Sequence, residues 1–288
     1  MRLAAPGCAL ALVVAAAAGC RLLPDEPVGQ GRSPLRPMTA SPDSVALEIV
    51  WARYPLGDAA LNDAAWRQID ETQIAPTTYR ELVRNGFRAG VISGTPPDAI
   101  ARALELDTYR PREPVDDEPD DPMVQTIDLT AEPTVQQRVL QLRRGKRAEI
   151  QASEVRESVP LLIGRGRELG GRTYQNVQAI YGLVVDPQPD QTVAVELTPE
   201  LHFGQPRLRW TGGEEGILRQ LPLREREVFE SMRLRVRLAP GEMLVLMGLE
   251  DSPSRLGELF HTAESQSGRQ QKLVLVRLAQ VPAGGTWE

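Results

Sequence analysis

The sequence predicts an α+β fold: a small α/β domain over residues 44–108, followed by a mainly antiparallel β-domain over residues 125–282. Strand-like and helix-like patterns alternate in the first region, whereas the second holds mostly short apolar runs, several of them with alternating polarity. Glycines and prolines separate many of these runs, as expected of tight turns between strands. At 288 residues the chain is long enough for one large domain or two small ones.

Residues 1–19 have the pattern of a secretory signal peptide, in which a charged start precedes a short apolar core. The apolar stretch Leu3–Ala18 is shorter than the roughly 20 residues that a membrane-spanning helix needs. It is followed by Gly19-Cys20, an ending that resembles the bacterial lipobox and implies lipidation of Cys20. An ordinary signal with a chance cysteine is the alternative. The chain has two cysteines, and because Cys8 lies within the signal, Cys20 has no disulfide partner in the mature protein.

A lipid on Cys20 would hold the mature chain to a membrane face without spanning the membrane. This predicts a cell-envelope location, as an outer membrane lipoprotein that faces the periplasm. Residues 20–43 are rich in proline and glycine and are expected to form an extended tether between the lipid and the fold. Residues 109–124 are acidic and Pro-rich, and this composition predicts a linker. A calcium site is not expected there, because the spacing of the acidic residues matches no calcium-binding EF-hand loop. Residues 283–288 form a short tail.

Within the small α/β domain the pattern predicts the order strand, helix, helix, strand, helix. The second helix is the best delimited, because Pro76 stands at its first turn and Asn85-Gly86 is a typical helix stop. The expected elements cover residues 44–54, 61–74, 76–86, 87–94 and 96–106.

The β-domain is predicted from nine apolar-rich runs, at residues 138–142, 147–152, 158–163, 174–185, 192–203, 207–210, 232–238, 242–249 and 271–281. In residues 233–238 arginine alternates strictly with an aliphatic residue, so one face of that strand is cationic and the other apolar. A solvated cationic face is the simpler interpretation, and an arginine row facing a polar lumen or a partner is the alternative. A strand that crosses a membrane needs about 9–11 residues. The run at 192–203 is interrupted by Pro199 and the run at 207–210 is too short, so no long amphipathic hairpin is expected.

The residues that catalysis requires are sparse. His202 and His261 lie in separate segments without metal-ligand spacing, and the Gly-rich stretch at residues 163–172 matches neither a dinucleotide-binding nor a P-loop motif. The sequence therefore predicts no enzyme, no metal and no cofactor. Loss of the signal removes Arg2 and leaves 32 basic against 39 acidic residues, a net charge of −7, which gives no bias toward nucleic acid.

The β-domain resembles the C-terminal β-domain of the secretins, the ring-forming outer-membrane proteins of type II and type III secretion and of type IV pili. Residues 135–281 hold four groups of family-like motifs in the family's order. The first three groups are Leu140-x-Leu142 with Gly145, Ala148-Glu149-Ile150 and Val159-Pro160; Tyr174-x-x-Val177; and Val193-x-Val195-x-Leu197-x-Pro199-Glu200. The last group is Leu234-x-Val236, Gly241-Glu242, Leu244 to Met247 with Gly248-Leu249, Leu256-Gly257-Glu258-Leu259-Phe260, and Lys272 to Val276.

The resemblance implies a structural turn and packing motif made by Gly241, Gly248, Leu249, Leu256, Gly257 and Phe260. In secretins the Gly-Leu strand end leads into a loop that packs back through the Leu-Gly-x-Leu-Phe piece, whose apolar side chains bury against the sheet. The chain departs from the family where Gln178 replaces a glycine, where the loop after Leu249 is short, and where the closing strand lacks its Thr-Pro end.

The function that the resemblance implies is a lipid-anchored structural protein in or beside a protein-secretion or pilus-type assembly of the outer membrane. Its partners would be the membrane, through the lipid, and either further copies of the chain or secretion-system proteins. The alternative is a monomeric envelope lipoprotein that holds a protein or the cell wall and forms no pore. The chain has room for only one small domain before the β-domain, where secretins carry several, which argues against a pore.

Overall fold

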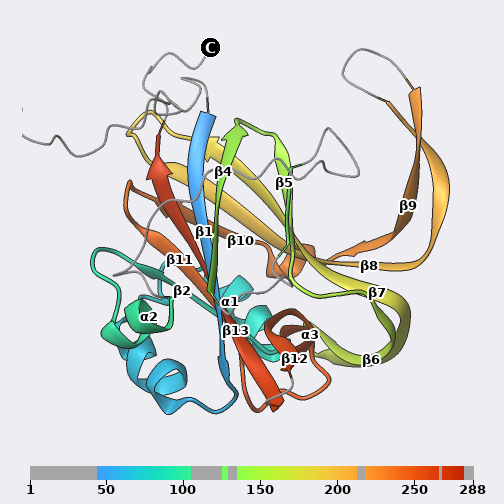
Figure 1. Cartoon of the computed structure of the whole chain (residues 1–288), viewed down its shortest axis with the longest axis horizontal. Helices are drawn as coiled ribbons and strands as arrows, with labels where there is room; N and C mark the ends of the chain where they lie inside the picture. Colours follow the sequence, from blue (N-terminus) through green and yellow to red (C-terminus); the bar gives the residue numbers. More distant parts are fainter. Residues whose placement is uncertain (1–43, 105–124, 129–134, 213–217, 266–267, 282–288) are drawn as a thin grey trace, which may run out of the picture. The chain divides into compact units, whose positions relative to one another are not determined.

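The computed structural model describes residues 44–104, 125–128, 135–212, 218–265 and 268–281, all within one compact unit that spans residues 40–288. The predicted signal, tether, linker 109–124 and tail 283–288 lie outside the described residues. Figure 1 shows that strands dominate the described part of the chain. The fold is β-rich, with antiparallel pairing almost throughout and one parallel pair, β3 with β5.

Two sheets form the framework of the described residues. The six-stranded sheet has the order β2-β11-β13-β1-β4, with β12 paired to β13. Its strands are β1 (Ser44–Pro55), β2 (Phe87–Ile92), β4 (Val135–Arg143), β11 (Met243–Gly248), β12 (Thr262–Ser265) and β13 (Gly268–Gln280). The seven-stranded sheet has the order β10-β8-β7-β5-β3, with β6 paired to β7 and β9 to β8. Its strands are β3 (Gln125–Asp128), β5 (Arg147–Gln151), β6 (Arg156–Arg165), β7 (Glu168–Pro187), β8 (Val193–Gly212), β9 (Leu218–Val228) and β10 (Leu234–Leu238).

The helices are short. Within the described ranges they are the π-helix η1 (Ala60–Ala64), the 3-10 helices η2 (Ala65–Gln68) and η4 (Glu230–Met232), and the α-helices α1 (Pro76–Arg84), α2 (Asp98–Ala103) and α3 (Leu256–His261). No helix among the described residues has the length and apolar character needed to cross a membrane.

The central strands β1, β11 and β13 of the six-stranded sheet are buried on both faces, which explains why they are apolar on both sides. In β1, Leu47 and Ile49 point into the core shared with the seven-stranded sheet, whereas Val50 and Ala52 point into a second core under η1, η2 and α2. β11 and β13 divide their side chains between the same two cores. Sheets covered on both faces carry nearly continuous apolar runs rather than strict alternation, and the run at residues 243–247 shows this pattern.

The predicted order strand, helix, helix, strand, helix is present in residues 44–103, but the separate small α/β domain is not confirmed. β1 pairs with β13 on one side and β4 on the other, and β2 pairs with β11. These strands therefore belong to a sheet completed by the C-terminal half of the chain. The helix expected over residues 61–74 is reduced to η1 and η2, which end at Gln68.

β8 differs from the prediction because it runs without interruption from Val193 to Gly212. Pro199 is accommodated within it opposite Tyr181 of β7, and its carbonyl accepts a hydrogen bond from the backbone N–H of Phe229 at 3.0 Å. Pro206 lies where the β8–β9 register shifts, and a bulge tolerates a residue without an N–H. β8 and β9 therefore form a longer hairpin than the short runs of the sequence predicted, with a register shift between Phe203 and Arg207.

The arginine row of β10 lies at an edge of the seven-stranded sheet. Leu234, Val236 and Leu238 are buried, whereas Arg235 and Arg237 are exposed. Arg235 pairs with Glu196 at 3.3 Å. This exposed, ion-paired face agrees with the simpler interpretation of a solvated strand face, and charged side chains on an edge strand oppose unwanted strand pairing.

Candidate functional site

The sequence motif after β11 forms a junction with the end of α1. β11 ends at Gly248, which pairs with Phe87 of β2. The backbone N–H of Leu249 donates to the carbonyl of Gly86 at 2.8 Å, and that of Gly257 donates to the carbonyl of Asn85, also at 2.8 Å. The loop between Gly248 and Gly257 therefore leaves the sheet beside the Asn85-Gly86 turn and returns to the same turn.

Glycine is required at this junction because two backbones nearly touch. A Cβ atom on Gly257 would lie 1.8 Å from the carbonyl oxygen of Gly86, far inside any permitted contact. Gly86 itself has a φ of +82°, a backbone conformation that side chains with a Cβ rarely adopt. At Gly248 a Cβ would lie 3.0 Å from the carbonyl oxygen of Gly257. The close approach of backbones, and not the turn alone, explains the glycines of the motif.

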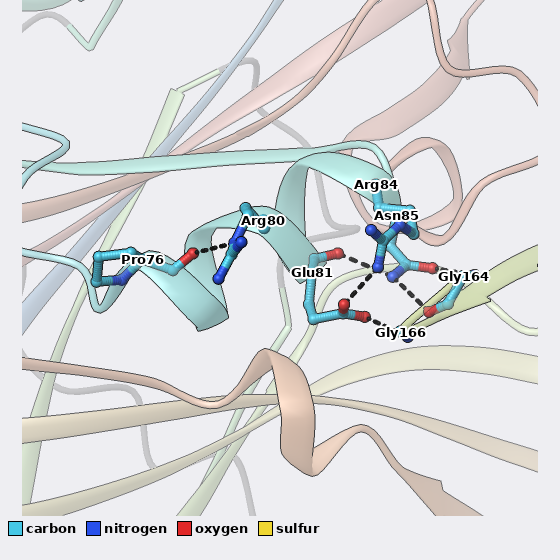
Figure 2. A network of polar contacts seen from close by, with 7 residues as sticks. All are labelled: Pro76, Arg80, Glu81, Arg84, Asn85, Gly164 and Gly166. Atoms are coloured by element: carbon cyan, nitrogen blue, oxygen red, sulfur yellow. Dashed lines mark hydrogen bonds and ion pairs between the residues drawn. The ribbon is translucent and has the colours of Figure 1, made fainter. Parts of the chain in front are cut away.

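Asn85 holds the third segment of the junction, the outer part of β6 (Figure 2). Its side-chain Oδ1 accepts the N–H of Gly164 at 2.9 Å, and its Nδ2 donates to the carbonyl of Gly164 at 3.0 Å. Nδ2 also donates to the carbonyl of Glu81, one turn back in α1. Asn85 is fully buried. Its amide thus pairs with β6 as a neighbouring strand would, a role that its place as a helix stop did not predict.

The apolar side chains of the motif bury in the core between the sheets. Leu256 and Phe260 are 0% and 1% exposed, whereas Leu249 is only partly buried. The Phe260 ring lies 5.2 Å from the ring of Phe87 and 4.7 Å from that of Tyr181, centroid to centroid. α3 is therefore a plug that contacts both sheets, because Phe87 belongs to β2 and Tyr181 to β7.

Gly241 takes no part in this junction. It lies in the turn between β10 and β11 with a φ of +89°, and its N–H donates to the carbonyl of Leu278 at 2.8 Å. Cys20 lies outside the described residues.

A buried polar chain fixes α3 between the sheets. His261 Nδ1 lies 3.0 Å from the backbone carbonyl oxygen of Lys272, which can only accept, so Nδ1 carries the proton. Nε2 is then the acceptor for the hydroxyl of Tyr181, at 2.6 Å. Burial lowers the pKa of His261 to about 3 and raises that of Tyr181 well above its usual range, so both side chains are neutral.

The burial of neutral His261 predicts acid destabilisation. Its pKa of about 3 in the folded protein is below the value of about 6.5 in the unfolded chain, so the unfolded chain alone takes up this proton as the pH falls below 7. We expect this residue to remove about 2 kcal/mol of unfolding free energy between pH 7 and pH 5. Urea unfolding at both pH values should show a smaller loss for His261→Gln than for the wild type. An equal loss in both proteins would show that His261 is not buried neutral.

A second polar cluster brings Glu149, Glu200 and His202 together on β5 and β8, with their ligand atoms within 4.8 Å of one another. Such a set could hold a metal ion, but a guanidinium already lies there: Arg147 Nη1 is 2.6 Å from Glu149 and Nη2 is 2.8 Å from Glu200. Gly182 of β7 leaves the space, because a Cβ there would lie 2.5 Å from a Glu200 oxygen.

The charge of Glu200 is stabilised although its carboxylate is buried. Burial would raise its pKa, but the hydrogen bond with His202 and the charge of Arg147 outweigh burial and lower it. The cluster is thus an ion-pair network that links β5 to β8. His202 lies in strand β8, as the sequence predicted.

A cleft of about 710 Å³ lies on the helix-covered face of the six-stranded sheet. Val50, Met243 and Leu275 contribute apolar side chains to its lining, and the paired charges of Glu48 and Arg277, 3.2 Å apart, contribute a polar part. Its size is that of a small-molecule or peptide pocket.

No protein-family model matches the sequence, and no curated protein matches it. Among solved structures the chain is similar to the type II secretin GspD from enteropathogenic Escherichia coli, at 10% sequence identity and a TM-score of 0.20. The match covers 81% of this chain and 65% of that one, so the chain spans less than two thirds of that secretin's length. At this TM-score the likeness establishes no shared fold.

Proposed function

We propose that the chain is a lipid-anchored structural protein of the cell envelope, which faces the periplasm and works in or beside a protein-secretion or pilus-type assembly of the outer membrane. The observation that carries the proposal is the ordered set of secretin-like motifs between Leu140 and Val276. No nucleic-acid partner, cofactor or catalytic activity is part of this function.

The junction supports a structural role. The junction joins α1, β6 and α3 to the sheets through the hydrogen bonds of Asn85 and Gly257 and through the close contact between Gly86 and Gly257. His261 is buried between the sheets, where its neutral imidazole is bonded to the Tyr181 hydroxyl and the Lys272 carbonyl. Buried, fully paired polar groups of this kind fix one arrangement of a core.

The lipid anchor is tested by intact mass. We expect the mature protein extracted from membranes to begin at Cys20 and to be heavier than its sequence by the mass of the attached acyl chains. The Cys20→Ser variant should lack this increment. Equal masses, corrected for the substitution, would end the lipoprotein half of the proposal, because no other cysteine remains in the mature chain.

The cleft beside Glu48 and Arg277 favours a second candidate, a monomeric envelope lipoprotein that binds a protein or cell-wall ligand. The two candidates differ in the mass of the extracted protein. The first predicts complexes of several chains, and the second predicts single chains.

A further inference from the structure

The outer part of β8 and β9 forms a two-stranded ribbon. β8 pairs with β7 as far as His202 and with β10 only up to Leu197, so beyond the bulge at residues 203–207 its one partner among the described strands is β9. Figure 1 shows this ribbon curving beyond the ends of the neighbouring strands. Among the described strands, residues 207–212 of β8 and 218–223 of β9 therefore pair only with each other.

One face of the ribbon presents apolar side chains to solvent. Leu208 and Trp210 are 68% and 66% exposed, compared with 54% for Leu169 on the hairpin of β6 and β7. Leu208 stands opposite Pro222, which is also exposed, and Trp210 stands opposite Gln220. Alternate residues of a strand share a face, so Leu208, Trp210 and Pro222 make one exposed patch.

The ribbon is cationic in an acidic protein. Residues 207–212 and 218–223 hold three arginines and no acidic residue, whereas the whole chain has a net charge of −6. The three arginines are Arg207, Arg209 and Arg219. An exposed apolar patch within a basic segment is complementary to a surface that combines anionic groups with apolar material, as an anionic phospholipid membrane does.

We propose that the ribbon is a peripheral membrane-contact element, which places Leu208 and Trp210 in the interfacial zone of an anionic phospholipid surface. Tryptophan is favoured there because its ring is apolar and its indole N–H remains hydrated. The proposal rests on the envelope location of the proposed function, but it assigns a second contact that does not depend on the lipid at Cys20.

The test uses the mature chain with Cys20→Ser, so that acyl chains do not mask the contact, and with Trp287→Phe. Trp51 and Trp66 are buried, so Trp210 is then the exposed fluorophore of this protein. We expect the protein to co-sediment with vesicles of phosphatidylglycerol and phosphatidylcholine, and we expect brominated acyl chains to quench Trp210. Higher salt should weaken the binding, because salt screens the arginines.

The decisive variants are Leu208→Ser with Trp210→Ser, compared with Leu169→Ser as a matched control. Leu169 is 54% exposed on the hairpin of β6 and β7. Loss of the patch should lower the vesicle partition coefficient by roughly ten-fold or more, given the apolar area removed, whereas the control should bind as the parent does. Equal binding by all three proteins would overturn the proposal, as would equal binding to vesicles of phosphatidylcholine alone.

Two further outcomes separate this proposal from the proposed function. In the first, the Cys20→Ser parent does not bind anionic vesicles, while the wild type carries its acyl chains and forms complexes. This result overturns the ribbon contact and leaves the proposed function standing. In the second, the parent binds vesicles through the patch, while the wild type is neither acylated nor assembled, which supports the contact and contradicts the proposed function.

Discussion

Gly257→Ala is expected to destabilise the fold by about 3 kcal/mol, near the upper end for overpacked sites, or to prevent folding. The new methyl group would lie 1.8 Å from the carbonyl oxygen of Gly86, which is backbone and cannot rotate away. Relief would require the loop after Gly248 to move off the turn, breaking the hydrogen bonds from Leu249 and Gly257. Urea unfolding monitored by circular dichroism measures the loss.

The matched control is Gly170→Ala, because a Cβ at Gly170 meets no atom within 4 Å and the residue is exposed in β7. We expect it to change the unfolding free energy by less than about 0.5 kcal/mol. A Gly257→Ala protein as stable as this control would mean that the loop does not lie against Gly86.

Phe260→Ala is expected to cost about 3–5 kcal/mol of unfolding free energy, the range for a buried Phe truncated to Ala. Its ring fills the space between Phe87 of one sheet and Tyr181 of the other, and its removal leaves a cavity that α3 cannot close alone. Leu169→Ala is the control, since Leu169 is exposed. A loss below about 0.5 kcal/mol for Phe260→Ala would place Phe260 at the surface and contradict the position of α3.

Local signals predicted the elements whose boundaries are set by nearby residues. Pro76 and Asn85-Gly86 delimit α1, because a proline at the first turn and a glycine after the last both have local conformational causes. The strict alternation in residues 233–238 marks β10, which has one buried and one exposed face. β9 was missed because Pro222 and the run of charges at residues 224–227 resemble a loop more than a strand.

The domain organisation was not predictable in the same way, since it depends on pairs that are distant in the chain. β1 was assigned to a separate domain, yet its partner β13 lies more than 200 residues later, as the pair Ile49 and Val276 shows. Periodicity reports which faces are apolar but not which strand covers them. A strand that is apolar on both faces, such as Met243–Gly248, was the available signal that this sheet is covered on both faces.

The polar parts of the site were hidden for the same reason. Tyr181 and His261 are 80 positions apart, so no local pattern joins them. Asn85 was recognised only as a helix stop, and its pairing with Gly164 depends on a strand 79 residues away. Glycines of the motif were recognised by resemblance, whereas the reason for Gly257 appears only once Gly86 is placed beside it.

Native mass spectrometry of the wild-type protein, extracted from membranes in mild detergent and measured over a range of concentrations, tests most directly whether this β-rich fold builds an envelope assembly. The account predicts complexes whose masses are whole multiples of the acylated chain. Single acylated chains at every concentration would contradict the assembly and leave a monomeric lipoprotein that binds its partner through the cleft at Glu48 and Arg277.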